Sequence, residues 1–98
     1  MKSSGAASDI VAADFLVCCN HGRTSKACTH TMRALRDSFL NIREINGVRP
    51  FGDTEDMCVT GTALIRRSSR ARFERDLKGT RIPGRNKRIT KAVVTLPP

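Results

Sequence analysis

A one-sided apolar stripe in the second quarter of the chain constrains the fold more than any other feature. Its members recur at steps of four, three, four and three residues, which is the period of an amphipathic α-helix. They are Cys28, Met32, Leu35, Phe39 and Ile42. We therefore predict a helix from about Ser25 to Leu40, with Thr24 or Ser25 capping its first free amides. A helix with one apolar face has to cover a second layer of structure, so the neighbouring segments should form a sheet.

Strand-length segments lie on both sides of this helix. The run Asp14–Cys19 is apolar and ends at the turn-prone residues 20–22. Residues 41–48 contain Ile42, Ile45 and Val48 around charged residues, and the strand that they predict stops at 49–52. After an acidic turn at 53–56, the segment 57–65 is rich in β-branched residues and predicts a third strand, with Gly61 as a candidate bulge.

The last third of the chain predicts a shorter helix and a closing strand. Charged residues at steps of four between Ser68 and Lys78 favour a short helix that ends at Gly79. Residues 80–87 contain Pro83 and Gly84 and predict an exposed loop, and residues 88–96 predict the final strand. The order strand, helix, strand, strand, helix, strand is that of a ferredoxin-like βαββαβ sandwich, an α+β fold with two layers.

The chain has room for one domain. Its 98 residues, of which 39% are hydrophobic, can bury a small core. We expect a flexible N-terminal segment over 1–13 and a single α/β nucleic-acid-binding domain over 14–98.

The net charge of the protein lies in one quarter of the sequence. Residues 66–91 contain eleven basic and two acidic side chains, which gives 11 − 2 = +9, whereas residues 1–65 contain seven of each. A neutral scaffold with one strongly cationic segment indicates a surface for a polyanion. The apolar and glycine residues within this segment argue against a simple solvating tail. A membrane-surface role is not expected, because no apolar helix face or lipidation signal accompanies the charge.

The cysteines predict reduced thiols in an intracellular compartment. Four cysteines occur, and the start of the sequence has no apolar run of the kind that directs secretion. Three cysteines and two histidines fall within residues 18–30, and cysteine and histidine are the residue types that usually bind zinc. Adjacent strand residues point to opposite faces, however, and Cys28 and His30 do not share a helix face. We therefore expect no metal site, with zinc as the alternative, and a buried thiol role for Cys18 or Cys19 together with Cys28.

No enzymatic activity, catalytic residue or cofactor is predicted. The sequence contains no nucleophile elbow or glycine-rich cofactor fingerprint, and a cysteine nucleophile with His21 or His30 as its base has no further support. Aromatic residues are also few: the chain has four phenylalanines and no tyrosine or tryptophan. We expect Phe15 and Phe39 in the core, which leaves only Phe51 and Phe73 exposed enough to stack on bases, so base stacking is not the expected mode of recognition. Recognition should then depend on contacts from arginine to phosphates.

Two families resemble parts of this sequence. The segment 84–96 is similar to the basic loop and closing strand of the large-subunit ribosomal protein family found beside the polypeptide exit, and the order of residues 15–39 also resembles that family. This resemblance implies binding of ribosomal RNA, with Arg81, Arg85, Lys87 and Arg88 on phosphates. The pairs 61–62, 71–72 and 82–83 resemble the bacterial histone-like DNA-bending family, which implies an architectural DNA-binding role.

The sequence thus predicts an RNA-binding structural protein of a ribonucleoprotein particle, with RNA favoured over DNA and with protein partners inside the particle. The alternatives are a DNA-binding or architectural protein, and a small regulatory interaction module, such as a viral one, that meets an acidic protein. The helix start at residues 20–26 is a further candidate anion contact. The predicted nucleic-acid-binding residues are Arg66, Arg67, Arg70, Arg72, Arg75, Lys78, Arg81, Arg85, Lys87, Arg88, Lys91, Arg23 and Lys26.

Overall fold

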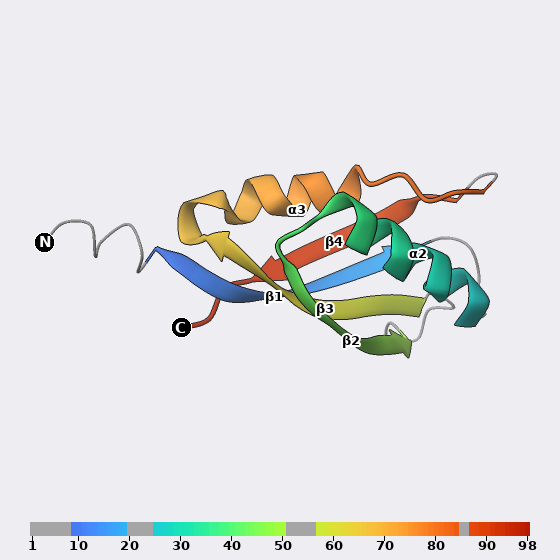
Figure 1. The fold of residues 1–98 in the computed structure, drawn as a ribbon, viewed down its shortest axis with the longest axis horizontal. Helices are drawn as coiled ribbons and strands as arrows, with labels where there is room; N and C mark the ends of the chain where they lie inside the picture. Colours follow the sequence, from blue (N-terminus) through green and yellow to red (C-terminus); the bar gives the residue numbers. More distant parts are fainter. Residues whose placement is uncertain (1–8, 20–24, 51–56, 85–86) are drawn as a thin grey trace, which may run out of the picture.

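The computed structural model is an α+β fold with a four-stranded antiparallel sheet and two α-helices (Figure 1). It describes residues 9–19, 25–50, 57–84 and 87–98. In chain order the elements are β1 (Ile10–Cys19), α2 (Ser25–Ser38), β2 (Ile42–Pro50), β3 (Met57–Arg66), the short 3-10 helix η1 (Arg67–Ser69), α3 (Arg70–Lys78) and β4 (Ile89–Thr95). No helix within the described residues is long and apolar enough to cross a membrane.

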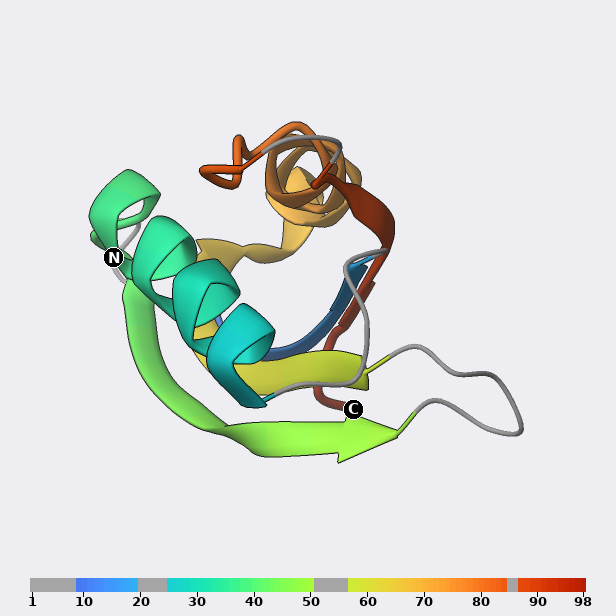
Figure 2. The ribbon, with the colours of Figure 1, turned by 90° about the vertical axis from the view of Figure 1, so that its right-hand side faces the viewer.

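The strands lie in the order β2-β3-β1-β4, so β2 and β4 form the two edges. The central pair, β1 and β3, runs in register from Ile10 opposite Arg66 to Cys18 opposite Cys58. Both helices cover the same face of this curved sheet, as the end-on view in Figure 2 shows. The other face of the sheet therefore remains uncovered by helices.

The core lies between the sheet and the helices. Because side chains alternate along a strand, every second residue of β1 from Ala13 to Cys19 points into this layer. Phe15 and Val17 are buried there together with Leu35 of α2 and Leu77 of α3. The predicted stripe packs against this cluster through Met32 of α2 and through Phe39. The helix ends at Ser38, two residues before the predicted end, so Phe39 follows it and Ile42 belongs to β2. The expected helix caps, Thr24 and the side chain of Ser25, lie outside what the structure describes.

The strands are longer than their apolar runs predict. β1 begins at Ile10, four residues before the predicted start at Asp14, because its alternating first half pairs with the end of β3. β2 continues to Pro50, which pairs with Met57, so the predicted stop at Arg49 is wrong. A proline is tolerated there because β2 is an edge strand. The predicted acidic turn at 53–56 lies outside the described residues.

Gly61 marks an irregular region of the sheet, although the register shift is in the neighbouring strand. β2 shifts its pairing with β3 between Ile45 and Gly47, beside Gly61, and Gly47 has a φ of 148°, a conformation that other residues rarely adopt. A Cβ on Gly61 would lie 2.6 Å from the Phe15 ring and would also collide with the Glu44 carbonyl oxygen. The glycine therefore allows the Phe15 ring to lie across β3.

The prediction of reduced thiols is wrong for two of the cysteines. Cys18 and Cys58 face each other directly across β1 and β3 and form a disulfide, with 4.2 Å between their Cα atoms. Cys19 points to the opposite face and is a buried thiol outside the disulfide, and its Sγ lies 3.2 Å from Thr31 Oγ1. The two adjacent cysteines point to opposite faces, as expected. The pairing of Cys18 with Cys58 on β3 was not predicted. The side chain of Cys28 and all of His21 lie outside the description.

The aromatic residues also depart from expectation. Phe73 is not available for stacking on bases, because only 6% of its surface is exposed. Its ring makes T-shaped contacts with Phe15 and Phe39 at centroid separations of 6.5 and 5.5 Å. Phe39 is half-buried, Phe15 is buried, and Phe51 lies outside the described residues. Within the part of the chain that the structure describes, no phenylalanine is exposed.

Candidate nucleic-acid interface

Helix α3 forms the centre of the cationic segment, and its buried side fixes the direction of its arginines. Phe73 and Leu77, four residues apart, are the buried residues of the helix. Since residues at this spacing share a face, Arg72 and Arg75 lie on the other side of the helix, and both are exposed. The helix ends at Gly79, whose N–H donates to the Arg75 carbonyl oxygen at 3.0 Å. The start and end predicted for this helix agree with the structure to within two residues.

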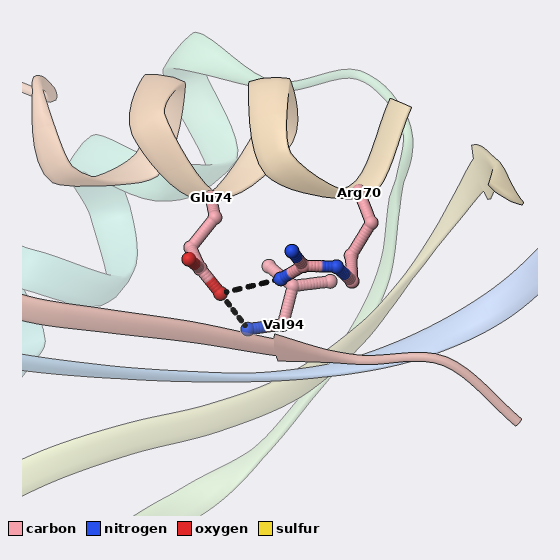
Figure 3. Close-up of polar contacts among 3 residues, drawn as sticks. All are labelled: Arg70, Glu74 and Val94. Atoms are coloured by element: carbon pink, nitrogen blue, oxygen red, sulfur yellow. Dashed lines mark hydrogen bonds and ion pairs between the residues drawn. The ribbon is translucent and has the colours of Figure 1, made fainter. Parts of the chain in front are cut away.

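Glu74, one of the two acids of the cationic segment, is turned toward the sheet. Its Oε2 accepts the backbone N–H of Val94 at 2.9 Å and the Arg70 Nη1 at 3.1 Å, as Figure 3 shows. Val94 lies on β4, which is an edge strand whose outward amides lack a neighbouring strand. The carboxylate thus satisfies an amide at the sheet edge. Arg70, predicted as a nucleic-acid contact, is partly occupied by this ion pair.

The remaining cations of α3 and its flanks face solvent. Each is exposed and has no ion pair with another described residue. They are Arg66, Arg72, Arg75, Lys78 and Arg81. Self-repulsion within such a group costs stability.

The loop after α3 is anchored so that its charged side chain stays outside. Ile82 is buried in the core, while its neighbours Arg81 and Pro83 are exposed. Arg81 also forms an isolated antiparallel bridge with Arg88, which brings the two ends of the loop together. Burial of Ile82 means that the predicted exposed loop is in part a packed one. Lys87 and Arg88 lie at its far end, and Arg85 is outside the described residues.

Other predicted contacts are spread around this centre. Arg67, before α3, donates from Nη1 to the Pro97 carbonyl oxygen at 3.2 Å, and its N–H donates to the Asp9 carbonyl oxygen at 3.0 Å. Lys91 is exposed on β4, opposite Cys18. The predicted anion contact at the start of α2 is not tested, because Arg23 and the side chain of Lys26 lie outside the described part.

One cationic hollow was missed by the sequence analysis. Arg33 and His30 of α2 line a hollow of about 420 Å³ together with Arg81 from the loop after α3. The periodicity of α2 places His30 and Arg33 away from its apolar stripe, so their exposure was predictable. No local pattern indicates which later loop packs beside them. A second hollow, of about 330 Å³, lies between α3 and β4 and contains Arg75, Lys78 and Lys91.

No family model, curated protein or solved structure matches this chain. The chemistry of the site itself therefore has to support any functional assignment. Within the described ranges, no three His, Cys, Asp or Glu residues gather as a metal site would require. The uncovered face of the sheet has a hollow of about 480 Å³, which is lined by one acidic side chain, Asp14, and one basic side chain, Lys91. Among the described residues, the surface around α3 is thus the site at which one sign of charge predominates most clearly.

Proposed function

We propose that this chain is an RNA-binding protein that holds phosphates on the cationic surface around α3. The observation that carries the proposal is the division of charge within that helix. Glu74 is turned toward β4, while Arg72, Arg75 and Lys78 are exposed without a described ion pair. Asp76 is the one acid exposed on this helix, so its outer side keeps three cations against one acid. Arginine and lysine in this arrangement suit phosphate oxygens, which accept forked or single hydrogen bonds.

The mode of recognition is contact with the sugar-phosphate backbone and with shape. The burial of Phe73 supports this mode, because stacking on bases needs exposed aromatic rings. RNA is favoured over DNA by the likeness of residues 84–96 to the ribosomal protein family, and a ribonucleoprotein particle is the setting that this likeness implies. The element order and the sheet order β2-β3-β1-β4 also support our assignment of the fold to the ferredoxin-like βαββαβ class.

Titration of a structured RNA at several salt concentrations tests the proposal. We expect log K to fall linearly with log salt, because binding releases the counterions of each contacted phosphate. The double variant Arg72→Gln/Arg75→Gln should bind more weakly and reduce the slope by about 2, or roughly one unit for each contact removed. Arg43→Gln is the matched control, since Arg43 is an exposed cation on β2, at the opposite edge of the sheet from β4.

Three outcomes would overturn the proposal. An affinity that does not change between low and moderate salt would remove the phosphate contacts from the mechanism. Competition by duplex DNA as strong as that by structured RNA would favour the DNA-binding alternative. A protein that binds no nucleic acid would favour a module that meets an acidic protein.

A further inference from the structure

Two cationic hollows flank the C-terminal end of α3. The β4-side hollow lies between α3 and β4 and contains Arg75, Lys78 and Lys91. The α2-side hollow lies between α2 and the loop after α3 and contains His30, Arg33 and Arg81. Figure 2 looks along α3 and shows β4 on one side of the helix and α2 on the other. The end of α3 therefore stands as a ridge between two positively charged depressions.

The ridge itself is short and exposed. Lys78 enters the β4-side hollow, and Arg81, three residues later, enters the α2-side hollow. A turn separates them, in which the Thr80 N–H donates to the Leu77 carbonyl oxygen at 3.1 Å. Gly79 is exposed at the crest of this turn. Lys78 and Arg81, which are close in sequence, thus line hollows on opposite sides of the end of α3.

Each hollow has more cations than acids. In the β4-side hollow, Glu74 lies beside the two α3 cations Arg75 and Lys78, and its carboxylate is already bonded to Arg70 and Val94. In the α2-side hollow, Asp37 is the acid beside Arg33 and Arg81. Either depression can therefore accept a phosphate group.

A single nucleic-acid strand has one line of phosphates. A double helix has two lines, one on each side of every groove. An α-helix with its side chains is about 10–12 Å across. The wide groove of a duplex has a similar width, about 12 Å for the major groove of B-form DNA, and the minor groove of A-form RNA is wide and shallow. A short ridge with cations on both flanks matches such a groove.

We infer that the partner is double-helical, with the end of α3 over a wide groove and one phosphate strand held in each hollow. This inference rests on the proposed function and narrows the substrate class from RNA in general to double-helical RNA. Arg75 and Lys78 hold one strand, and Arg33 and Arg81 hold the other. In helical RNA the minor groove is wide and shallow whereas the major groove is deep and narrow, so we assign the ridge to the minor groove.

The test compares two double variants on three probes. The variants are Arg75→Gln/Lys78→Gln and Arg33→Gln/Arg81→Gln, with Arg43→Gln as the control. The probes are an RNA hairpin with a long stem, a single-stranded RNA of the same composition, and a DNA duplex. We expect each double variant to reduce the salt slope on the hairpin by about 2. A single strand can occupy one hollow, so one of the two double variants should leave the affinity for single-stranded RNA within twofold of wild type. Unchanged unfolding midpoints verify that both variants fold.

The failure of this inference is distinguishable from failure of the proposed function. If wild type binds the hairpin in a salt-dependent way but both double variants weaken single strand and hairpin equally, the two-strand arrangement is wrong while RNA binding stands. If Arg33→Gln/Arg81→Gln changes neither probe, the α2-side hollow holds no phosphate. If the DNA duplex binds as tightly as the hairpin or more tightly, the proposed preference for RNA fails, and the assignment of the partner as double-helical RNA fails with it. If wild type binds none of the probes, the proposed function itself fails.

Discussion

The Glu74 carboxylate accepts the Val94 N–H at 2.9 Å and thereby fastens α3 to the edge of the sheet. A carboxylate on a backbone amide makes a charge-assisted hydrogen bond, which is stronger than a neutral one. The same contact removes negative charge from the outer side of a helix whose exposed side chains are mainly arginine and lysine. Edge protection and charge separation are thus achieved by one residue.

Replacement of Glu74 should therefore destabilise the fold. We expect Glu74→Ala to lower the free energy of unfolding by about 1–3 kcal/mol, because the Val94 amide loses a charged acceptor. Arg70→Ala is the matched control. It removes only the exposed ion pair to Glu74, which is worth about 0.3–0.5 kcal/mol at this spacing. Urea denaturation followed by circular dichroism measures both, and equal losses for the two variants would contradict the role of Val94.

Gly61 should tolerate no side chain. In Gly61→Ala, the new methyl group would collide with the Phe15 ring and the Glu44 carbonyl oxygen. Overpacking of this kind costs about 1–3 kcal/mol. Gly79→Ala is the control, because its Cβ would meet its nearest atom, the Arg75 carbonyl oxygen, at an ordinary 3.6 Å. A thermal or urea midpoint for Gly61→Ala as high as that for Gly79→Ala would show that Phe15 can move aside.

The Cys18–Cys58 disulfide should contribute much of the stability of so small a domain. It joins residues 40 apart in sequence, and closing a loop of that length in the unfolded chain stabilises the native state by about 4 kcal/mol in the chain-entropy model. We expect dithiothreitol to lower the urea midpoint of wild type. The double variant Cys18→Ala/Cys58→Ala should start lower and not respond to the reductant. Alkylation of the unreduced protein, followed by peptide mapping, should leave Cys18 and Cys58 unlabelled.

Local periodicity was enough to predict the elements, and long-range pairing was not. The stripe of α2 and the four-residue steps of α3 predict helices because the residues that meet in a helix are close in sequence. The disulfide depends on the register of β1 against β3, which brings together residues 40 positions apart. The α2-side hollow likewise depends on where the loop carrying Arg81 packs. The cationic residues of the candidate site were thus predictable individually, but their division between two hollows was not.

Phe73 distinguishes recognition through phosphate contacts, which the sequence predicts, from recognition by stacking on bases. Its ring is buried between Phe15 and Phe39, so Phe73→Leu should cost stability, about 1–3 kcal/mol from reshaped packing and lost aromatic contacts. It should leave the affinity for RNA within twofold of wild type, because no base can reach the ring. Fluorescence anisotropy with a labelled RNA hairpin measures this affinity, in buffer without urea and at a temperature well below the thermal midpoint of the variant. A tenfold loss of affinity in a folded Phe73→Leu protein would mean that the ring stacks on a base, and recognition would then not rest on phosphates alone.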